Sequence, residues 1–284
     1  SNVLVLGESG TGKELVARSL HDLSRHSAGP YVTVNCAAFS ESLLESELFG
    51  HDVGAFTGAD RRHLGQFERA HRGTIFLDEV GEMSQACQAK LLRILEGHPF
   101  LRLGGDALIS VDVRVIAATH RNLLELIKEK RFREDLYYRL RVIDIQVPPL
   151  RDRGDDILEL AGLFIEQFRH QLGKGLRRLS PEAAHAIRHH RWPGNVRELK
   201  NAIERAVVLA PEEEITTADL GLQETSPATE AVPLLTATLK EAEIRHIRQV
   251  LASVKGNKTQ ACKILGIGRA TLYNKLGSQH GTDA

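Results

Sequence analysis

The stretch Gly7-Glu8-Ser9-Gly10-Thr11-Gly12-Lys13 decides the fold that this sequence predicts. It follows the apolar run Val3–Leu6, which is typical of a strand, and precedes Glu14–Leu23, which has helical spacing. A glycine-rich turn between a strand and a helix directs backbone N–H groups into a concave nest that binds phosphate. We therefore expect Lys13 to reach the β- and γ-phosphates of a nucleotide. A purely structural turn is the alternative, but the strand–loop–lysine–helix order argues against it.

A second run supplies the carboxylates that such a loop needs. Thr74–Leu77 is apolar and is followed by Asp78 and Glu79, and ligands of open parallel sheets bind at the carboxyl ends of the strands. Asp78 would hold magnesium, directly or through water, and Glu79 would polarise the water that attacks a phosphoanhydride. Taken alone, the pair could equally cap a helix. The loop departs from its usual pattern at Glu14, where a magnesium-binding Ser or Thr is expected, yet we expect nucleotide binding to survive.

The order of runs along the chain predicts an α/β fold with a mostly parallel sheet in residues 1–150. Residues 151–220 are predicted to contain helices only, 221–236 to be a linker rich in Gly, Pro and small polar residues, and 237–284 to form a small all-α unit. The predicted strands are Val3–Leu6, Tyr31–Asn35, Thr74–Leu77, Val113–Ala117 and Val142–Gln146, and helices between them include Glu14–Leu23, Ser84–Glu96 and Leu123–Lys130.

Three helix starts carry capping signals. Ser180 is followed by Pro181, which suits an N-cap and the first helical position. Asn195 has Glu198 three residues later, and Asn257 has Gln260 at the same spacing, as in a capping box. We therefore predict that Ser180, Asn195 and Asn257 each cap a helix.

Composition excludes several classes of protein. Lysine plus arginine and aspartate plus glutamate are both 37, which excludes a generally basic nucleic-acid coat. Aromatic residues make up 5%, too few for a base-stacking single-strand platform. The three cysteines form no CxxC pair and predict reduced thiols in a cytoplasmic protein. No apolar run approaches the roughly 18 residues of a membrane helix, and the start at Ser1 indicates a fragment of a longer protein.

Several motifs together resemble one known family over nearly the whole chain. Beside the phosphate loop and Thr74–Glu79, the hexapeptide Gly54-Ala55-Phe56-Thr57-Gly58-Ala59 is the most specific. The sequence resembles the AAA+ P-loop NTPase domain of sigma-54-dependent transcription activators, the bacterial enhancer-binding proteins of the NtrC type. Further matching blocks are residues 45–51, 132–140 and 192–199. The resemblance implies an AAA+ core, a helical lid at 151–220 and a two-component regulatory system.

In that family the hexapeptide forms the tip of a surface loop that contacts sigma-54. The residues are compatible with this role, because Gly54 and Gly58 permit sharp, mobile backbone around Phe56 and Thr57. A loop whose Phe56 folds back into the core is the alternative. Residues 101–106 resemble the family's second, supporting loop.

The resemblance also implies roles for residues around the nucleotide. Asn35 matches the residue that switches Glu79 between nucleotide states, and Thr119 and Arg197 match the two sensors of bound nucleotide. His120 stands where the family usually has Asn. Arg133 and Arg139 match arginine fingers that reach a neighbouring subunit's nucleotide. Ordinary ion pairs with Glu134 or Asp135 are the alternative for these arginines.

The C-terminal unit looks like the Fis-type helix-turn-helix domain of these activators. Residues 255–276 carry five lysines and arginines and no acidic residue, a local excess that suits phosphate contact. A basic dimerisation module is the alternative. The candidate DNA-contacting residues are Lys258, Thr259, Arg269, Thr271, Tyr273, Asn274 and Lys275.

The sequence thus predicts a motor that uses ATP and Mg²⁺ to remodel sigma-54 RNA polymerase holoenzyme from the closed to the open promoter complex. The family works as a homo-oligomeric ring, a hexamer or heptamer, bound to double-stranded enhancer DNA through dimeric DNA-binding domains. The family's N-terminal segment, which helps hold adenine, and its receiver or other sensory domain are absent from this chain. A DNA-binding regulator with a vestigial nucleotide domain is one rival hypothesis. An AAA+ unfoldase or helicase loader is the other.

Overall fold

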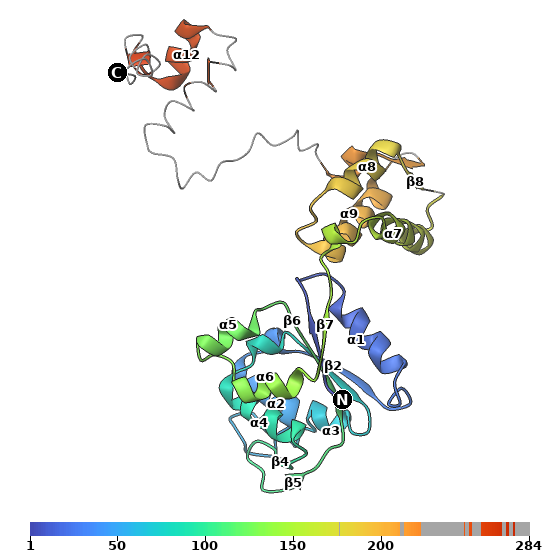
Figure 1. Ribbon diagram of the computed structural model, residues 1–284, viewed down its shortest axis with the longest axis vertical. Helices are drawn as coiled ribbons and strands as arrows, with labels where there is room; N and C mark the ends of the chain where they lie inside the picture. Colours follow the sequence, from blue (N-terminus) through green and yellow to red (C-terminus); the bar gives the residue numbers. More distant parts are fainter. Residues whose placement is uncertain are drawn as a thin grey trace. The chain divides into compact units, whose positions relative to one another are not determined.

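The computed structural model describes residues 1–175, 177–210, 213–222, 247, 250, 251, 257–268, 271, 272 and 275. The chain forms two compact units, Ser1–Glu224 and Thr225–Ala284 (Figure 1). Within the described ranges, no helix is both long enough and apolar enough to span a bilayer.

A five-stranded parallel sheet forms the centre of the first unit, in the order β2-β3-β6-β1-β7. Its apolar, β-branched runs suit strands that are buried on both faces. The prediction of an α/β fold with a parallel sheet is confirmed, and each predicted strand is present with its ends shifted by at most two residues. The bounds are Val3–Leu6 for β1, Tyr31–Asn35 for β2, Thr74–Asp78 for β3, Arg114–Thr119 for β6 and Ile143–Gln146 for β7.

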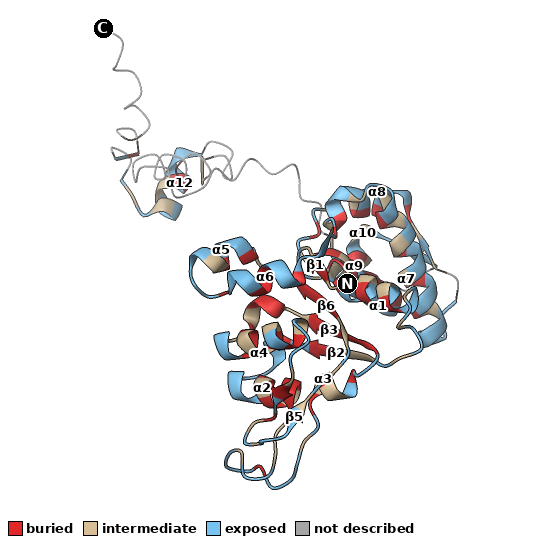
Figure 2. Cartoon of the chain, turned by 60° about the horizontal axis from the view of Figure 1, so that its bottom comes forward, coloured by how far each residue is buried: buried red, intermediate tan, exposed pale blue. Residues whose placement is uncertain are grey.

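Alternate residues of the strands pack on opposite faces of the sheet. Val5, Phe76 and Ile116 join the core under α1 (Lys13–Asp22). The inner strands β3 and β6 are mostly red, the colour of buried residues, in Figure 2. Leu4 and Leu77 belong to the larger core on the other face of the sheet. The helices on that side are α2 (Glu41–Phe49), α3 (Gln66–Arg69), α4 (Gln85–Leu95), α5 (Leu123–Lys128) and α6 (Glu134–Leu140).

Short elements connect this framework. The single-turn helices are η1 (Cys36–Ala38), η2 (Val80–Glu82) and η3 (Leu150–Asp152), and a small antiparallel ribbon pairs β4 (Phe100–Leu101) with β5 (Leu108–Ile109). Cys36 and Cys87 are buried free thiols, and burial raises the pKa of both. They belong to the core, as their apolar surroundings predict.

A helical subdomain follows η3 in the same unit. Its core surrounds the fully buried Trp192, whose indole N–H donates to the carbonyl of Ile187 at 2.8 Å. The helices are α7 (Asp156–Leu172), α8 (Pro181–His189), α9 (Asn195–Leu209) and α10 (Thr217–Leu220). The prediction of helices only was wrong, because β8 (Arg178–Leu179) pairs in parallel with β9 (Glu214–Ile215). Two-residue strands are too short to show an alternating pattern.

The predicted caps divide into two that form and one that does not. Ser180 caps α8 by accepting from the N–H of Ala183, and Asn257 caps α12 (Lys258–Leu265) by accepting from that of Gln260. The prediction for Asn195 was wrong. Gly194 is the N-cap of α9, and its N–H donates to Glu198 Oε2 at 2.7 Å. The amide of Asn195 is engaged by other partners, described below.

In the second unit, α12 ends at Gly266, which adopts a left-handed conformation with φ 66°. Ala261 on α12 and Leu272 beyond the turn are both buried. Helix, glycine turn and a further helical segment agree with a helix-turn-helix. Of the candidate DNA-contacting residues, Arg269, Tyr273 and Asn274 lie outside the described residues.

Phe67→Ala tests the larger core. The Phe67 ring is fully buried and stacks on Phe49 with centroids 5.7 Å apart. Truncation should lower the free energy of unfolding by about 3–5 kcal/mol, as typical for a buried Phe. Urea unfolding followed by circular dichroism measures this. Leu23→Ala, at an 89% exposed position, should change it by less than about 0.5 kcal/mol; equal losses in the two variants would refute this assignment of the core.

Candidate functional site

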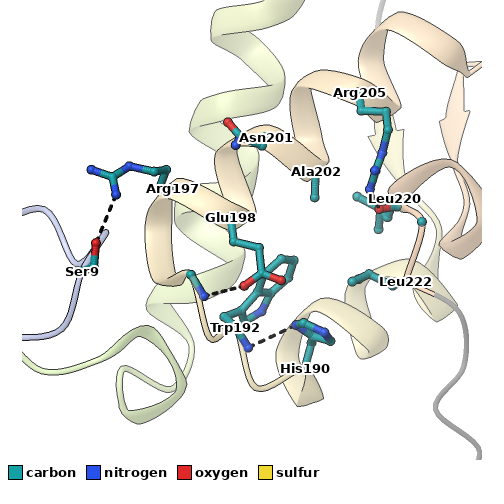
Figure 3. Close-up of a pocket in the computed structure, with 12 residues that line it drawn as sticks. Ser9, His190, Trp192, Arg197, Glu198, Asn201, Ala202, Arg205, Leu220 and Leu222 are labelled. Carbon is teal, nitrogen blue, oxygen red and sulfur yellow. Dashed lines mark hydrogen bonds between the residues drawn. The ribbon is translucent and has the colours of Figure 1, made fainter.

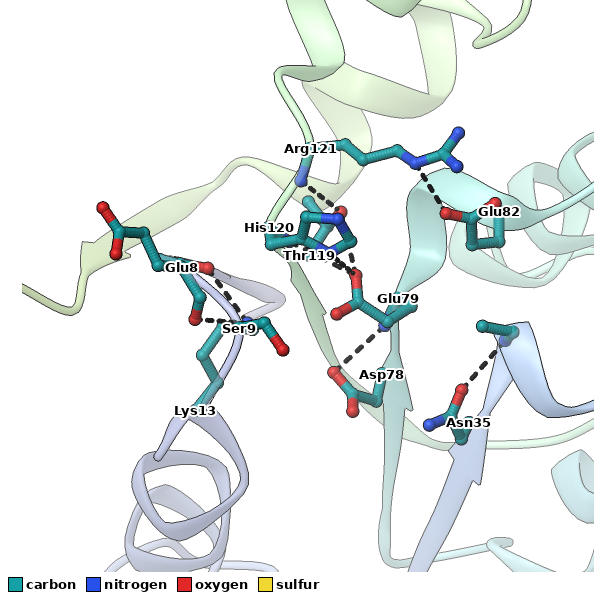
Figure 4. A network of polar contacts seen from close by, with 12 residues as sticks. Glu8, Ser9, Lys13, Asn35, Asp78, Glu79, Glu82, Thr119, His120 and Arg121 are labelled. Atoms are coloured by element: carbon teal, nitrogen blue, oxygen red, sulfur yellow. Dashed lines mark hydrogen bonds and ion pairs between the residues drawn. The ribbon is translucent and has the colours of Figure 1, made fainter. Parts of the chain in front are cut away.

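The glycine-rich loop connects β1 to the first turn of α1. Gly10 and Gly12 have φ angles of 77° and 96°, which favour glycine. Lys13 is buried, and its ammonium donates to the carbonyls of Gly7 and Glu8 at 2.9 and 3.1 Å (Figure 4). These carbonyls hold the cation where phosphate oxygens would compete for it. Glu14 is exposed on the first turn of α1.

The carboxylates lie at the same edge of the sheet, as predicted. Asp78 ends β3 opposite Asn35, which ends β2, and its carboxylate accepts from the N–H of Glu79 at 3.1 Å. Burial raises the pKa of Asp78, the charge of Glu79 adds to this, and Lys13 opposes it. A divalent cation would favour the ionised carboxylate, so the donor set fits magnesium.

Glu79 itself is held by the end of β6. It has a left-handed backbone with φ 55°, which a non-glycine residue adopts at some energetic cost. Its Oε2 lies 2.7 Å from His120 Nδ1 and 3.3 Å from the His120 backbone N. The hydroxyl of the buried Thr119 approaches the same oxygen at 3.5 Å. Thr119 and His120 therefore form the polar surroundings of this carboxylate.

Asn35 does not contact Glu79 in this structure. Its side-chain oxygen accepts from the N–H of Ala37 at 2.9 Å and so caps η1. The resemblance implies Asn35 as the partner of Glu79, whereas in the structure His120 contacts the carboxylate of Glu79. The signal that could have identified His120 was its substitution for the usual Asn.

Arg197 approaches the loop from the lid subdomain. It lies on α9, and its guanidinium donates to Ser9 Oγ at 3.2 Å (Figure 3). A cavity of about 690 Å³ adjoins this contact and includes Trp192 and Arg205 in its wall. The structure thus brings Arg197 to the phosphate loop, as the resemblance implies.

A second cavity, of about 680 Å³, begins at Thr11 and Gly12 and extends between the core and the lid. Apolar side chains make up much of its wall, among them Leu15 and Val16 of α1 and Leu160 and Val196 of the lid. An apolar cavity beside a phosphate loop suits a planar base. Sequence reasoning missed these residues, because Leu15 and Val196 gave only ordinary helical signals.

The two candidate arginine fingers are exposed around α6. Arg133 forms a two-point ion pair with Asp135, with N–O distances of 3.0 and 2.6 Å. In this single chain Arg133 therefore makes the ordinary ion pair that the sequence offers as the alternative to an arginine finger. Such an exposed ion pair is weak, so it holds Arg133 only loosely. Arg139 is exposed as well, and both guanidinium groups are therefore accessible to another subunit.

The hexapeptide forms an exposed turn. Gly54 and Gly58 have φ angles of 81° and 98°, and the N–H of Gly54 donates to the carbonyl of Ala59 at 3.0 Å. Phe56 is 44% exposed, and its ring meets the His51 ring edge-on with centroids 4.9 Å apart. Thr57 is exposed. Phe56 is therefore not part of the core, which argues against the alternative.

Residues 101–106 pack against this turn and the residues just before it. Leu103 bridges to His51, and a Cβ on Gly104 would lie 2.8 Å from Ala55, so only glycine allows the close approach. The buried Arg102 donates two bonds to Glu68 and lies 3.8 Å from Asp52, just before the hexapeptide. The guanidinium thus joins the segment just before the hexapeptide to α3.

Four of the seven candidate DNA-contacting residues lie in the described part of the second unit. Lys258 and Thr259 are exposed at the start of α12. Beyond the turn, Thr271 is exposed and Lys275 is half-buried.

Comparison with known proteins gives three matching families. Residues 1–146 match the family described as Sigma-54 interaction domain. Residues 151–233 match the AAA+ ATPase lid domain, and residues 238–277 match the Fis family of bacterial regulatory proteins.

Relatives and solved structures agree with these matches. The regulatory protein AtoC of Escherichia coli K12 is 48% identical over 292 residues, which cover 100% of this chain. The transcriptional regulatory protein ZraR of the same strain is 50% identical over 280 residues, which cover 97% of this chain. The chain spans 63% of the length of each. The nitrogen fixation protein AnfA of Azotobacter vinelandii is 48% identical over 275 residues, 96% of this chain and 52% of that protein.

The crystal structure of NtrX from Brucella abortus has a TM-score of 0.76 and 37% identity, covering 98% of this chain and 64% of that one. Its complex with ATP has a TM-score of 0.73 at the same 37% identity, covering 99% and 64%. Because the match over residues 1–146 covers more than half of the chain, the protein belongs to the sigma-54 interaction domain family, here joined to an AAA+ lid and a Fis-type helix-turn-helix domain.

Proposed function

We propose that this chain is an ATP-hydrolysing transcriptional activator. It converts sigma-54 RNA polymerase holoenzyme from the closed to the open promoter complex while bound to double-stranded enhancer DNA. The observation that carries the proposal is the exposed Phe56–Thr57 turn, braced on a core that also presents a phosphate loop and two carboxylates. A chain with these partners works in the cytoplasm.

The residues fit ATP with magnesium. The loop N–H groups and Lys13 would hold the phosphates, and the cavity at Leu15 would take the base. Asp78 would hold magnesium, which neutralises charge on the phosphates during hydrolysis. Glu79 would orient the attacking water and accept its proton, and Arg197 would contact the phosphates from the lid. NtrX was crystallised with ADP and with ATP, which supports this assignment.

Hydrolysis would depend on a ring of subunits, a hexamer or heptamer. The exposed Arg133 and Arg139 would reach the phosphates in the neighbouring site, where an arginine stabilises the charge of the transition state. Arg133 would exchange Asp135 for phosphate oxygens on assembly. In another nucleotide state, the carboxylate of Glu79 would leave His120 and form a hydrogen bond with the amide of Asn35.

DNA binding would increase the local concentration of the ring at its promoter. Lys258, Thr259, Thr271 and Lys275 would contact the duplex together with Arg269, Tyr273 and Asn274, from domains paired as dimers. The rival hypothesis of a vestigial nucleotide domain gains no support from the site, since Lys13, Asp78 and Glu79 all lie at the edge where a nucleotide would bind.

Open-complex formation tests the proposal. The purified chain, at a concentration high enough to bypass the enhancer, should make promoter thymines reactive to permanganate with sigma-54 holoenzyme and ATP. A non-hydrolysable analogue should give no open complexes, and neither should Lys13→Ala, which removes the phosphate-binding cation. Vigorous ATP hydrolysis without open complexes would contradict the proposed target.

Thr57→Ala separates hydrolysis from remodelling. Thr57 is exposed on the hexapeptide turn, so ATPase activity should stay within about twofold of the unchanged chain, as for surface changes away from a site. Open-complex formation should be lost, because the hydroxyl belongs to the surface that meets sigma-54. The exposed Ser110 provides a control, since Ser110→Ala should retain both activities. Loss of both activities together in Thr57→Ala would contradict the separation of roles.

His120→Ala tests the environment of Glu79. Removing the imidazole 2.7 Å from Glu79 Oε2 should lower kcat by about tenfold or more, the order of a mispositioned general base. The Kd for ADP should change little, because His120 contacts Glu79 rather than the loop. His120→Asn, which keeps a hydrogen-bonding group, should retain most of kcat. An unchanged kcat in His120→Ala would show that Glu79 needs no such partner.

A further inference from the structure

The amide of Asn195 joins the lid to the phosphate loop. It is fully buried at the start of α9. Its Nδ2 donates to Glu8 Oε2 at 3.1 Å and to the carbonyl of Ser9 at 3.0 Å. Its Oδ1 accepts from the N–H of Leu150 at 2.8 Å, at the beginning of η3. One side chain thus connects the loop, the lid and the segment 148–153 that contains η3, which we call the hinge.

The backbone of Asn195 is adapted to this task. Its φ angle is 53°, a left-handed conformation that asparagine tolerates better than most residues. A buried amide without partners would be costly, whereas Asn195 uses both of its donors and its acceptor. This full use of the side chain indicates a specific joint rather than a cap.

Glu8 brings a negative charge to a loop that should bind anionic phosphates. Arg151 of η3 donates to both of its oxygens, at 2.9 and 2.6 Å. The hydrogen bonds from Arg151 and Asn195 lower the pKa of Glu8 to about 2. The carboxylate therefore stays ionised, and the paired guanidinium offsets its charge on the loop.

The lid and hinge also hold the loop carbonyls that follow. The carbonyl of Gly10 accepts from the Arg197 N–H at 3.3 Å, and that of Thr11 accepts from Arg153 at 2.7 Å. A Cβ on Gly10 would overlap the carbonyl oxygen of Gly194, so the two backbones touch. Three consecutive carbonyls, from Ser9 to Thr11, thus have partners outside the core.

This pattern fixes the direction of the loop N–H groups. In a trans peptide the N–H points opposite to the C=O of the same unit. When the carbonyls of Ser9, Gly10 and Thr11 face the lid and hinge, the N–H groups of the following residues face away from them. Those N–H groups form the nest that binds phosphate.

We propose that Asn195 is a positioning residue of the nucleotide site. By holding Glu8 and Ser9 against the lid, it sets the loop in its phosphate-binding shape before nucleotide arrives. It acts through the loop, so it governs affinity for the phosphates more than the hydrolytic step. The inference rests on the proposed function, because it assumes that this loop binds nucleotide.

Asn195→Asp is the nearly isosteric test. It removes both donor bonds and places a second carboxylate beside Glu8. The Kd for ADP, measured by titration calorimetry on the full chain, should rise at least about tenfold. The kcat at saturating ATP should change by less than about threefold, since Asp78 and Glu79 are untouched. Glu204→Gln, an exposed change on the same helix, should leave both values unchanged.

Exchanging donor and acceptor should restore binding. In Glu8→Gln/Asn195→Asp the glutamine amide donates to the new carboxylate, and the Kd should recover at least half of the loss on a logarithmic scale. Arg151→Gln, at an exposed side chain, keeps the test open where Asn195→Asp does not fold. It should raise the Kd about fivefold by leaving the charge of Glu8 without its guanidinium partner, and adding Glu8→Gln should reverse this.

The outcomes are distinguishable. An unchanged chain that binds no ADP would overturn the proposed function and this inference with it. If the unchanged chain binds ADP and Asn195→Asp binds it equally well, only the inference fails. A double variant as weak as Asn195→Asp would also overturn it, because the Glu8 pairing would then not be the cause.

Discussion

The parallel register of the central sheet is the constraint on which the site depends. Leu6 of β1 lies opposite Thr119 of β6, and Asn35 of β2 lies opposite Asp78 of β3. Because all strands run the same way, the phosphate loop after β1, the carboxylates after β3 and the sensor residues after β6 reach one edge. A one-residue slip of β3 would exchange its two buried faces. The cores on both sides of the sheet therefore hold the geometry of the candidate site.

Much of this framework was predictable because its signals are local. Strands that are buried on both faces appear as apolar runs, so β1, β3 and β6 could be predicted almost to the residue. The edge strands β2 and β7 are more exposed, but their β-branched residues still indicate strands. The phosphate loop requires glycines and a lysine at fixed offsets, and the hexapeptide stands out by its composition, while its expected role came from the resemblance. Conversely, β8 and β9 are only two residues each and carry no pattern that a sequence window detects.

The contacts that the sequence could not supply are those made by distant segments. Asn195 with Glu198 has the spacing of a capping box, yet its amide binds Glu8 across 187 residues of chain. Likewise, Glu79 meets His120 because β3 and β6 are neighbours in the sheet, a fact of topology rather than of spacing. A local rule gave one partner for Asn195 and the resemblance gave one for Glu79, and in both cases the tertiary structure provided another.

The two functional loops share a way of being held. Both are rich in glycine and contribute little apolar surface, so burial alone cannot fix their shape. In each, a buried polar side chain is among the groups that hold the loop, Asn195 at the phosphate loop and Arg102 at the hexapeptide. A polar anchor of this kind depends on a few directional bonds, and small displacements break them, whereas a packed core resists such displacements. Loops anchored in this way could change between discrete positions while the sheet between them stays unchanged, and the proposed nucleotide-driven remodelling would require that combination.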